Sequence, residues 1–130
     1  MAEMVPDRMP HGASQGEKRL FSILQKAPDD YIVYYEPIIA GRYPDFVVIC
    51  PDLGLTVIEV KGWYPREIQE ANDNDVRILD RNGQIRAEKH PQRQARDYMF
   101  GLMELCTRQQ GFEILLNASG EARKPVRLSF

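Results

Sequence analysis

The segment PDFVVICPDLGLTVIEVKGW, residues 44–63, constrains the fold more than any other part of the chain. Phe46–Cys50 is a continuous apolar run, which is typical of a strand buried on both faces. Pro51–Gly54 has the residues of a turn, and Leu55–Lys61 follows as a second predicted strand. Strands of this kind belong in the middle of a sheet that other elements cover.

Two helices are predicted to supply that cover. Ser14 and Glu17 fit a capping box that opens the first helix, and Pro28 ends it. Pro91 suits the first position of the second helix, whose apolar stripe fades near Gly111. The order helix, strands, helix, strand predicts an α/β sandwich around a mixed sheet.

The other segments are shorter or less regular. An Asn-Gly pair within 80–83 predicts a hairpin of residues 76–79 and 84–87. Residues 1–13 have no period and contain two prolines, so we expect a flexible arm there. The remaining expectations are a strand over 31–35, a polar loop over 70–75 and a short strand over 126–130.

Composition places the chain among globular proteins, with 43% hydrophobic and 28% charged residues in 130. No apolar run approaches the roughly eighteen residues that a membrane span needs. The N-terminus lacks an apolar signal core, so a cytoplasmic protein with no membrane partner is expected. Cys50 and Cys106 have no metal-type spacing and are predicted to be buried free thiols.

The second strand of the central segment ends in charged residues. Because side chains alternate along a strand, Glu59 and Lys61 share one face, about 7 Å apart. Asp45 stands at the start of the preceding strand. If the two strands pair as an antiparallel hairpin, Asp45, Glu59 and Lys61 converge.

Two neighbouring carboxylates repel each other unless one is protonated or a cation lies between them. Mg²⁺ prefers carboxylate, water and phosphate oxygens, and a nearby lysine can orient water and stabilise negative charge. This layout favours metal-assisted phosphodiester hydrolysis. The alternative is a surface ion pair at a strand end, worth about 0–1 kcal/mol. The central position of the strands weighs against it, because an uncompensated buried charge is costly.

Pro44-Asp45, a gap of thirteen residues and Glu59-Val60-Lys61 resemble the PD-(D/E)xK signature of the restriction-endonuclease-like superfamily. With neighbouring motifs, this pattern resembles the NERD (nuclease-related) domain over about residues 14–110. The resemblance implies a restriction-endonuclease-like core within residues 14–130, a mixed β-sheet flanked by helices in the order αβββαβ. The motifs are Gly16-Glu17, Asp45-Phe-Val-Val, Glu59-Val-Lys-Gly-Trp63 and His90-Pro-x-x-Gln94-Ala-Arg-x-Tyr98.

The resemblance also implies roles for individual residues. Asp45 and Glu59 would bind Mg²⁺, or alternatively Mn²⁺, with the carbonyl of Val60 as a third ligand. Lys61 would position the water, and Glu17 would assist metal binding. Gln94 would act near the phosphates with Tyr98. Each of the last three has another interpretation: Glu17 fits the capping box equally well, Tyr98 lies on the apolar stripe, and Gln94 could hydrogen-bond the sheet.

A basic stretch precedes and enters the second helix. Residues 86–96 carry four basic side chains against one glutamate, although the chain has a net charge of −2. A helix N-terminus also favours anions. We expect nucleic acid to bind here, and a solvated helix face is the alternative. The predicted contacts are Lys89, Arg93, Gln94 and Arg96.

The sequence therefore predicts a Mg²⁺-dependent nuclease acting on DNA in processing or repair, with RNA left open as a substrate. NERD domains often precede helicase modules, so the chain could also be a fragment of a longer protein. A second hypothesis is a non-catalytic module that binds nucleic acid or a partner beside a helicase in cis or trans. A purely structural α/β domain with an ion-pair network at the strand end is the third.

Overall fold

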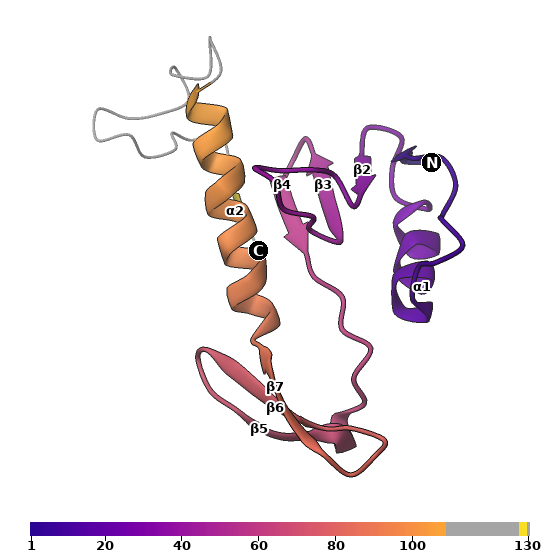
Figure 1. Ribbon diagram of the computed structural model, residues 1–130. Coiled ribbons are helices and arrows are strands. Elements are labelled where there is room, and N and C mark those ends of the chain that lie inside the picture. The colour runs from indigo at the N-terminus through magenta and orange to yellow at the C-terminus, as the bar shows by residue number, and fades with distance from the viewer. Residues whose placement is uncertain (109–127, 130) are drawn as a thin grey trace.

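The computed structural model describes residues 1–108 and 128–129 as a mixed α/β fold with two sheets (Figure 1). The larger sheet has five strands in the order β1-β2-β3-β4-β8. β2, β3 and β4 pair antiparallel, whereas β1 and β8 join the two edges in parallel. The strands are β1 (Glu3–Val5), β2 (Ile32–Tyr35), β3 (Phe46–Cys50), β4 (Gly54–Ile58) and β8 (Leu128–Ser129).

The predicted central hairpin is confirmed, and β3 has the expected bounds. Gly54 follows the turn with φ of 84°, a left-handed conformation that favours glycine. β4 ends at Ile58, so the expected continuation to Lys61 is wrong. The reason lies at its end, where the side chain of Asp45, rather than a strand carbonyl, accepts the N–H of Val60 at 2.7 Å.

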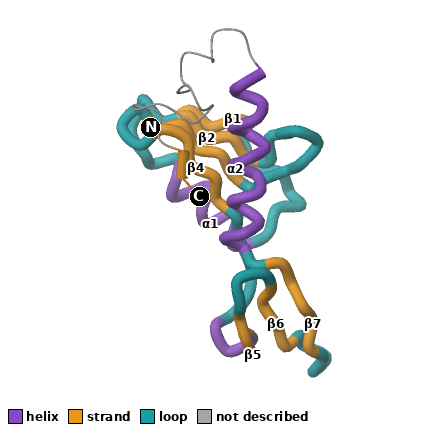
Figure 2. The backbone as a smooth tube through the Cα atoms, turned by 90° about the vertical axis from the view of Figure 1, so that its left-hand side faces the viewer, coloured by secondary structure: helices purple, strands orange, loops and turns teal. Residues whose placement is uncertain are grey.

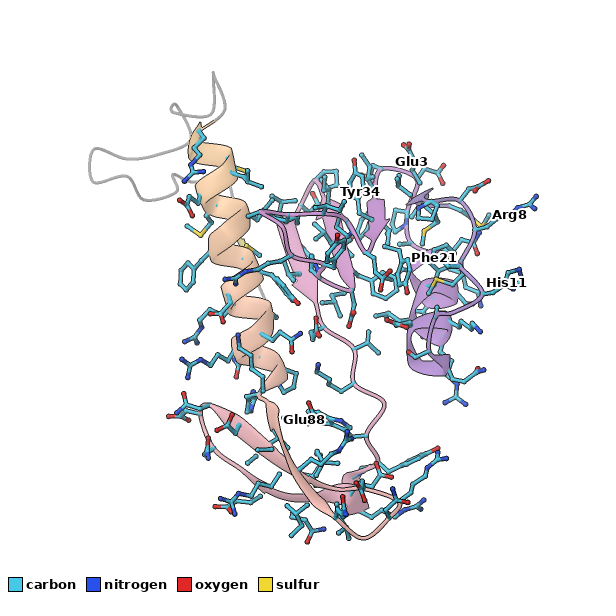
Figure 3. The ribbon with its side chains drawn as sticks, viewed as in Figure 1. Glu3, Arg8, His11, Phe21, Tyr34 and Glu88 are labelled. Atoms are coloured by element: carbon cyan, nitrogen blue, oxygen red, sulfur yellow. The ribbon has the colours of Figure 1, made fainter. Side chains whose placement is uncertain are left out.

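One helix covers each face of the larger sheet, α1 (Gln15–Leu24) on one side and α2 (Pro91–Arg108) on the other (Figure 1). Side-chain alternation along β3 serves both helices. Phe46 packs in the cluster that contains Phe21 of α1, whereas Val47 packs in the cluster that contains Met99 of α2. In Figure 3, Phe21 lies between α1 and the sheet, while the exposed side chain of His11 points outward.

The capping box of α1 is also confirmed, with Ser14 as the N-cap and Glu17 as its partner. The first residues of the expected flexible arm over 1–13, however, belong to the larger sheet. β1 pairs with β2, and Ala2 and Met4 are buried in the core with only 7% and 9% exposure. A strand of three residues is too short for a periodic pattern to reveal it.

The smaller sheet follows β4 and a 3₁₀ turn, and it is drawn below the larger sheet in Figures 1 and 2. Its predicted hairpin is confirmed, with Gly83 in the turn at φ of 77°. The stretch expected as a polar loop from residue 70 lies partly in an additional strand, β5, whose residues are all exposed. The elements are η1 (Pro65–Glu67), β5 (Ile68–Ala71), β6 (Asp75–Leu79) and β7 (Ile85–Lys89).

The predicted end of the second helix near Gly111 lies outside the described residues, as does most of the predicted strand over 126–130. β8 falls within that range. Cys50 is buried and Cys106 is half-buried, and both are free thiols. Among the described residues, no helix has the length and apolar character required to cross a membrane.

Candidate functional site

A chain of hydrogen bonds links the end of β4 to α2. The ammonium of Lys61 donates to Glu59 Oε1 at 3.1 Å and to Gln94 Oε1 at 3.0 Å. The amide nitrogen of Gln94 in turn donates to the hydroxyl of Tyr98 at 3.2 Å. The structure thus brings Lys61, Glu59 and Gln94 together, and Gln94 faces the lysine rather than hydrogen-bonding the sheet.

Asp45 lies directly before β3, on the other strand of the hairpin. Phe46 pairs with Ile58, so the next step of the same register sets Asp45 opposite Glu59. Opposed residues of antiparallel strands point to the same face. The position of Asp45 is also fixed by its hydrogen bond to the backbone N–H of Val60. This bond involves the N–H of Val60, and the role of its carbonyl stays a prediction.

The first turn of α1 approaches the same place. A Cβ atom added to Gly16 would lie 3.1 Å from Val60 Cγ1, so the glycine permits close packing of the helix against the strand end. The next residue, Glu17, then reaches Asp45. The two interpretations of Glu17 are therefore compatible, because one of its carboxylate oxygens accepts the N–H of Ser14 while the side chain joins an acidic cluster.

That cluster contains Glu17, Glu36 and Asp45, with one oxygen of each lying within 4.8 Å of the others. Glu36 is the member that sequence analysis missed. It follows β2 in a left-handed conformation with φ of 45°, and its N–H donates to the carbonyl of Asp45 at 2.9 Å. The pairing of β2 with β3 places Glu36 here: Tyr35 pairs with Phe46, so the next residue, Glu36, comes opposite Asp45.

Three ionisable groups at this site have pKa values above their ordinary range. Burial and the charge of Asp45 raise the pKa of Glu59, and Lys61 opposes this shift. The pKa of Asp45 is raised mainly by burial and further by Glu17, against the hydrogen bond from Val60. Burial, together with the charges of the acidic cluster, raises the pKa of Tyr35 to about 12. The protein therefore places several carboxylates close together in a partly buried region.

These residues fit a hard divalent cation. Among the described residues, Glu59 Oε2 is the buried side-chain oxygen or nitrogen without a hydrogen-bond partner, and the Glu59 side chain is only 6% exposed. An unpartnered buried carboxylate oxygen is costly unless a ligand compensates it. The acidic cluster of Glu17, Glu36 and Asp45 supplies carboxylate oxygens, which Mg²⁺ and Mn²⁺ prefer, and Glu59 is not a member of that cluster.

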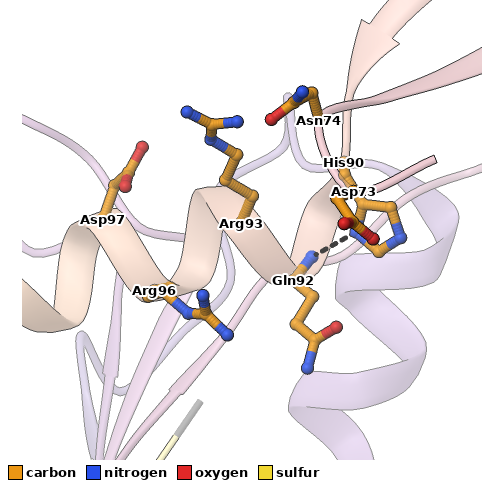
Figure 4. A pocket seen from close by; sticks show the side chains of 7 residues that line it. All are labelled: Asp73, Asn74, His90, Gln92, Arg93, Arg96 and Asp97. Carbon is orange, nitrogen blue, oxygen red and sulfur yellow. Dashed lines mark hydrogen bonds between the residues drawn. The ribbon is translucent and has the colours of Figure 1, made fainter.

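The predicted nucleic-acid residues divide between two cavities beside α2. Arg93 and Arg96 line a cavity of about 540 Å³ at the start of the helix (Figure 4). Lys89 instead forms an ion pair with Asp97 and lines a neighbouring cavity of about 470 Å³ together with Gln94. Gln94 therefore borders both the second cavity and Lys61.

The profile of the nuclease-related domain (NERD) family matches residues 12–123, and the chain belongs to this family. The membership expected from the four motifs is thereby confirmed. No curated protein and no solved structure matches the chain.

Proposed function

We propose that the chain is a Mg²⁺-dependent nuclease of the PD-(D/E)xK type that hydrolyses phosphodiester bonds of DNA in the cytoplasm, in DNA processing or repair. The supporting observation is the buried carboxylate of Glu59, which is bound by Lys61 through one oxygen and has no partner at the other. Family membership supports a nuclease-related function. We assign the larger sheet and its two helices to the restriction-endonuclease-like core.

Asp45 and Glu59 would hold the cation, with Glu17 and the Val60 carbonyl as further ligands. Glu36 extends this set because its carboxylate lies in the cluster with Glu17 and Asp45. When bound, Mg²⁺ or Mn²⁺ supplies Lewis acidity and lowers the pKa of water. The raised pKa values of Asp45 and Glu59 are consistent with carboxylates that need a positive partner in order to stay ionised.

Lys61 is assigned to the attacking water. An ammonium has three N–H donors, and two are directed to Glu59 and Gln94. The third is available to orient a water, and the positive charge stabilises the negative charge that develops on the phosphate. Gln94 is a positioning residue: its amide accepts from Lys61 while its nitrogen is tied to Tyr98.

DNA would reach this site along the start of α2. Arg93 and Arg96 are exposed there, and the N-terminus of the helix adds backbone N–H groups and a partial positive charge. These groups contact phosphates in the proposal, and Lys89 and Gln94 extend the surface toward Lys61.

The direct test is incubation of the purified protein with labelled single-stranded DNA, duplex DNA and RNA, with Mg²⁺, Mn²⁺ or chelator. We expect cleavage of DNA that requires a divalent cation. A net charge of −2 favours a second candidate, a non-catalytic module that serves a helicase in cis or trans. Failure to bind divalent ions by calorimetry, with no cleavage, would leave that candidate.

A further inference from the structure

A third cavity, of about 380 Å³, lies where the chain leaves the candidate site and enters the smaller sheet. Its volume falls in the range of about 300–1,000 Å³ that is usual for small-ligand sites. The aromatic residues Trp63 and Tyr64 line it, together with Ile78 and Leu79 of β6. Asn82, in the turn between β6 and β7, adds a side-chain amide.

This cavity begins beside the candidate site. Lys61 Nζ lies 5.8 Å from the centroid of the Trp63 ring, within the range of a cation–π contact. The same ammonium donates to Glu59 and Gln94. A molecule in the cavity would therefore contact an aromatic ring that itself contacts the proposed water-orienting lysine.

Tyr64 is an exposed aromatic residue held in a defined position. The residue is 54% exposed, yet the guanidinium carbon of Arg66 lies 4.8 Å from its ring centroid. Its backbone N–H donates to Glu67 Oε2 at 2.9 Å. Exposed aromatic rings that are fixed in this way, with arginine nearby, are the platforms on which proteins stack unpaired bases.

The aromatic residues of this cavity, rather than its charges, favour a base over a phosphate. Two arginines, Arg81 and Arg86, line it together with two acids, Glu67 and Asp80, so the formal charges cancel. Asp80 also holds the turn, since its Oδ1 accepts the N–H groups of residues 82 and 84 at 2.8 and 2.9 Å. The cavity at the start of α2 has the same formal balance, with Arg93 and Arg96 against Asp73 and Asp97. It differs in lying at a helix N-terminus, which favours anions, and so it suits the sugar–phosphate backbone.

We propose that the cavity beside Trp63 and Tyr64 binds an unpaired base of DNA, so that the nuclease acts on single strands or single-stranded ends. A base within a duplex has both faces covered by its neighbours and cannot stack on Tyr64. This inference rests on the proposed function, because it specifies the substrate of that same site.

Binding is tested without cleavage, in chelator, with a short oligothymidylate and a blunt duplex of equal length. Trp63 is the single tryptophan of the chain, so its fluorescence reports on this cavity. We expect oligothymidylate to quench it. Tyr64→Ala should weaken oligothymidylate binding about 5- to 150-fold, which corresponds to stacking of about 1–3 kcal/mol per base.

Two variants serve as controls. Tyr64→Phe keeps the ring and should bind like the wild type, and Phe100→Ala removes an aromatic side chain of similar exposure from α2 and should change nothing. Unchanged oligothymidylate affinity of Tyr64→Ala, or an equal loss on the blunt duplex, would overturn the inference.

The proposed function can fail separately. A protein that shows the expected quenching and Tyr64→Ala effect, but cuts no DNA with Mg²⁺ or Mn²⁺, retains the base-binding cavity and loses the nuclease assignment. Conversely, metal-dependent cleavage by both the wild type and Tyr64→Ala at one rate, with no fluorescence change, retains the nuclease and overturns the cavity.

Discussion

At the end of the β3–β4 hairpin, the pair of Lys61 and Glu59 is close, at 3.1 Å, and its side chains are 25% and 6% exposed. On the β5–β7 sheet, Arg77 and Glu70 are 3.9 Å apart, and both are more than 60% exposed. Exposed pairs contribute about 0–1 kcal/mol and are easily exchanged. A buried carboxylate with one unpartnered oxygen is a burden on stability, so its presence points to a function.

The two regions also differ in what covers them. The hairpin is packed between α1 and α2, which fixes its charged end on both sides. In the smaller sheet only Val76 and Ile78 are buried, and the edge strand β5 is exposed along its length. We therefore expect substitutions at the hairpin end to affect chemistry, and those in and around the smaller sheet to affect recognition.

The largest effect is expected for Lys61→Ala. It removes the proposed water-orienting donor and should lower the cleavage rate by at least about 100-fold, the usual cost of losing one such group. Mg²⁺ affinity should persist or rise, because a competing positive charge is lost. Cleavage assays paired with calorimetry measure both, and Lys26→Ala, an exposed lysine elsewhere, is the control. A fully active Lys61→Ala variant would show that Lys61 and Glu59 form an ion pair without a catalytic role.

Glu59→Gln should weaken Mg²⁺ binding by about 10- to 100-fold or more, since even groups that only support metal ligands have effects of this size. Glu36→Gln should have a smaller effect, because Glu36 is exposed. Titration calorimetry compares the two variants. Equal metal affinity of Glu59→Gln and the wild type would remove Glu59 from the ligand set.

The same carboxylate predicts the pH dependence of stability without metal. Its folded-state pKa is raised, so the folded protein binds more protons than the unfolded chain. The free energy of unfolding should therefore fall as pH rises from the ordinary glutamate range through the raised pKa. Glu59→Gln should flatten this dependence, and Mg²⁺ should oppose the fall. Denaturant titrations across this pH range check both; a wild-type stability that rises there contradicts the assignment.

Replacing the arginines at the start of α2 should change the affinity for DNA rather than the rate of cleavage. If Arg93 and Arg96 contact phosphates, replacing both with alanine should flatten the slope of log affinity against log salt by about two on duplex DNA. Arg77→Ala, at an exposed position of β6 in the smaller sheet, is the control. An unchanged slope would assign the two arginines to a solvated helix face.

Much of the larger sheet and its helices could be predicted because local signals there agree with the packing. β3 is an unbroken apolar run, and the capping box of α1 and the proline of α2 mark helix starts. The predictions failed where structure depends on distant partners. Met4 becomes part of a strand only because β2 lies beside it, and residues 59–61 leave the strand because Asp45 takes the N–H of Val60.

The candidate site shows the same division. The approach of Asp45 to Glu59 and Lys61 follows from the β3–β4 hairpin, which sequence can supply, although the last two residues lie past the end of β4. Glu36 was missed because Glu36-Pro37 was interpreted only as the end of a strand. Its place in the acidic cluster depends on the register of β2 against β3, and register is set by the pairing of whole strands.

The smallest expected effect concerns the packing of α1 against the hairpin end. In a helix interior, alanine is about 1 kcal/mol more favourable than glycine. Gly101→Ala in α2 should approach that gain, because its Cβ would meet only Ala40 at 4.0 Å. Gly16→Ala should gain less, since its Cβ would lie 3.1 Å from Val60 Cγ1 and force the helix or the strand end to shift. Because Glu17 follows Gly16, this shift should also weaken Mg²⁺ binding, which Gly101→Ala should leave unchanged. Thermal unfolding and calorimetry on both variants measure the difference, and identical behaviour would mean that the approach of α1 does not position Glu17.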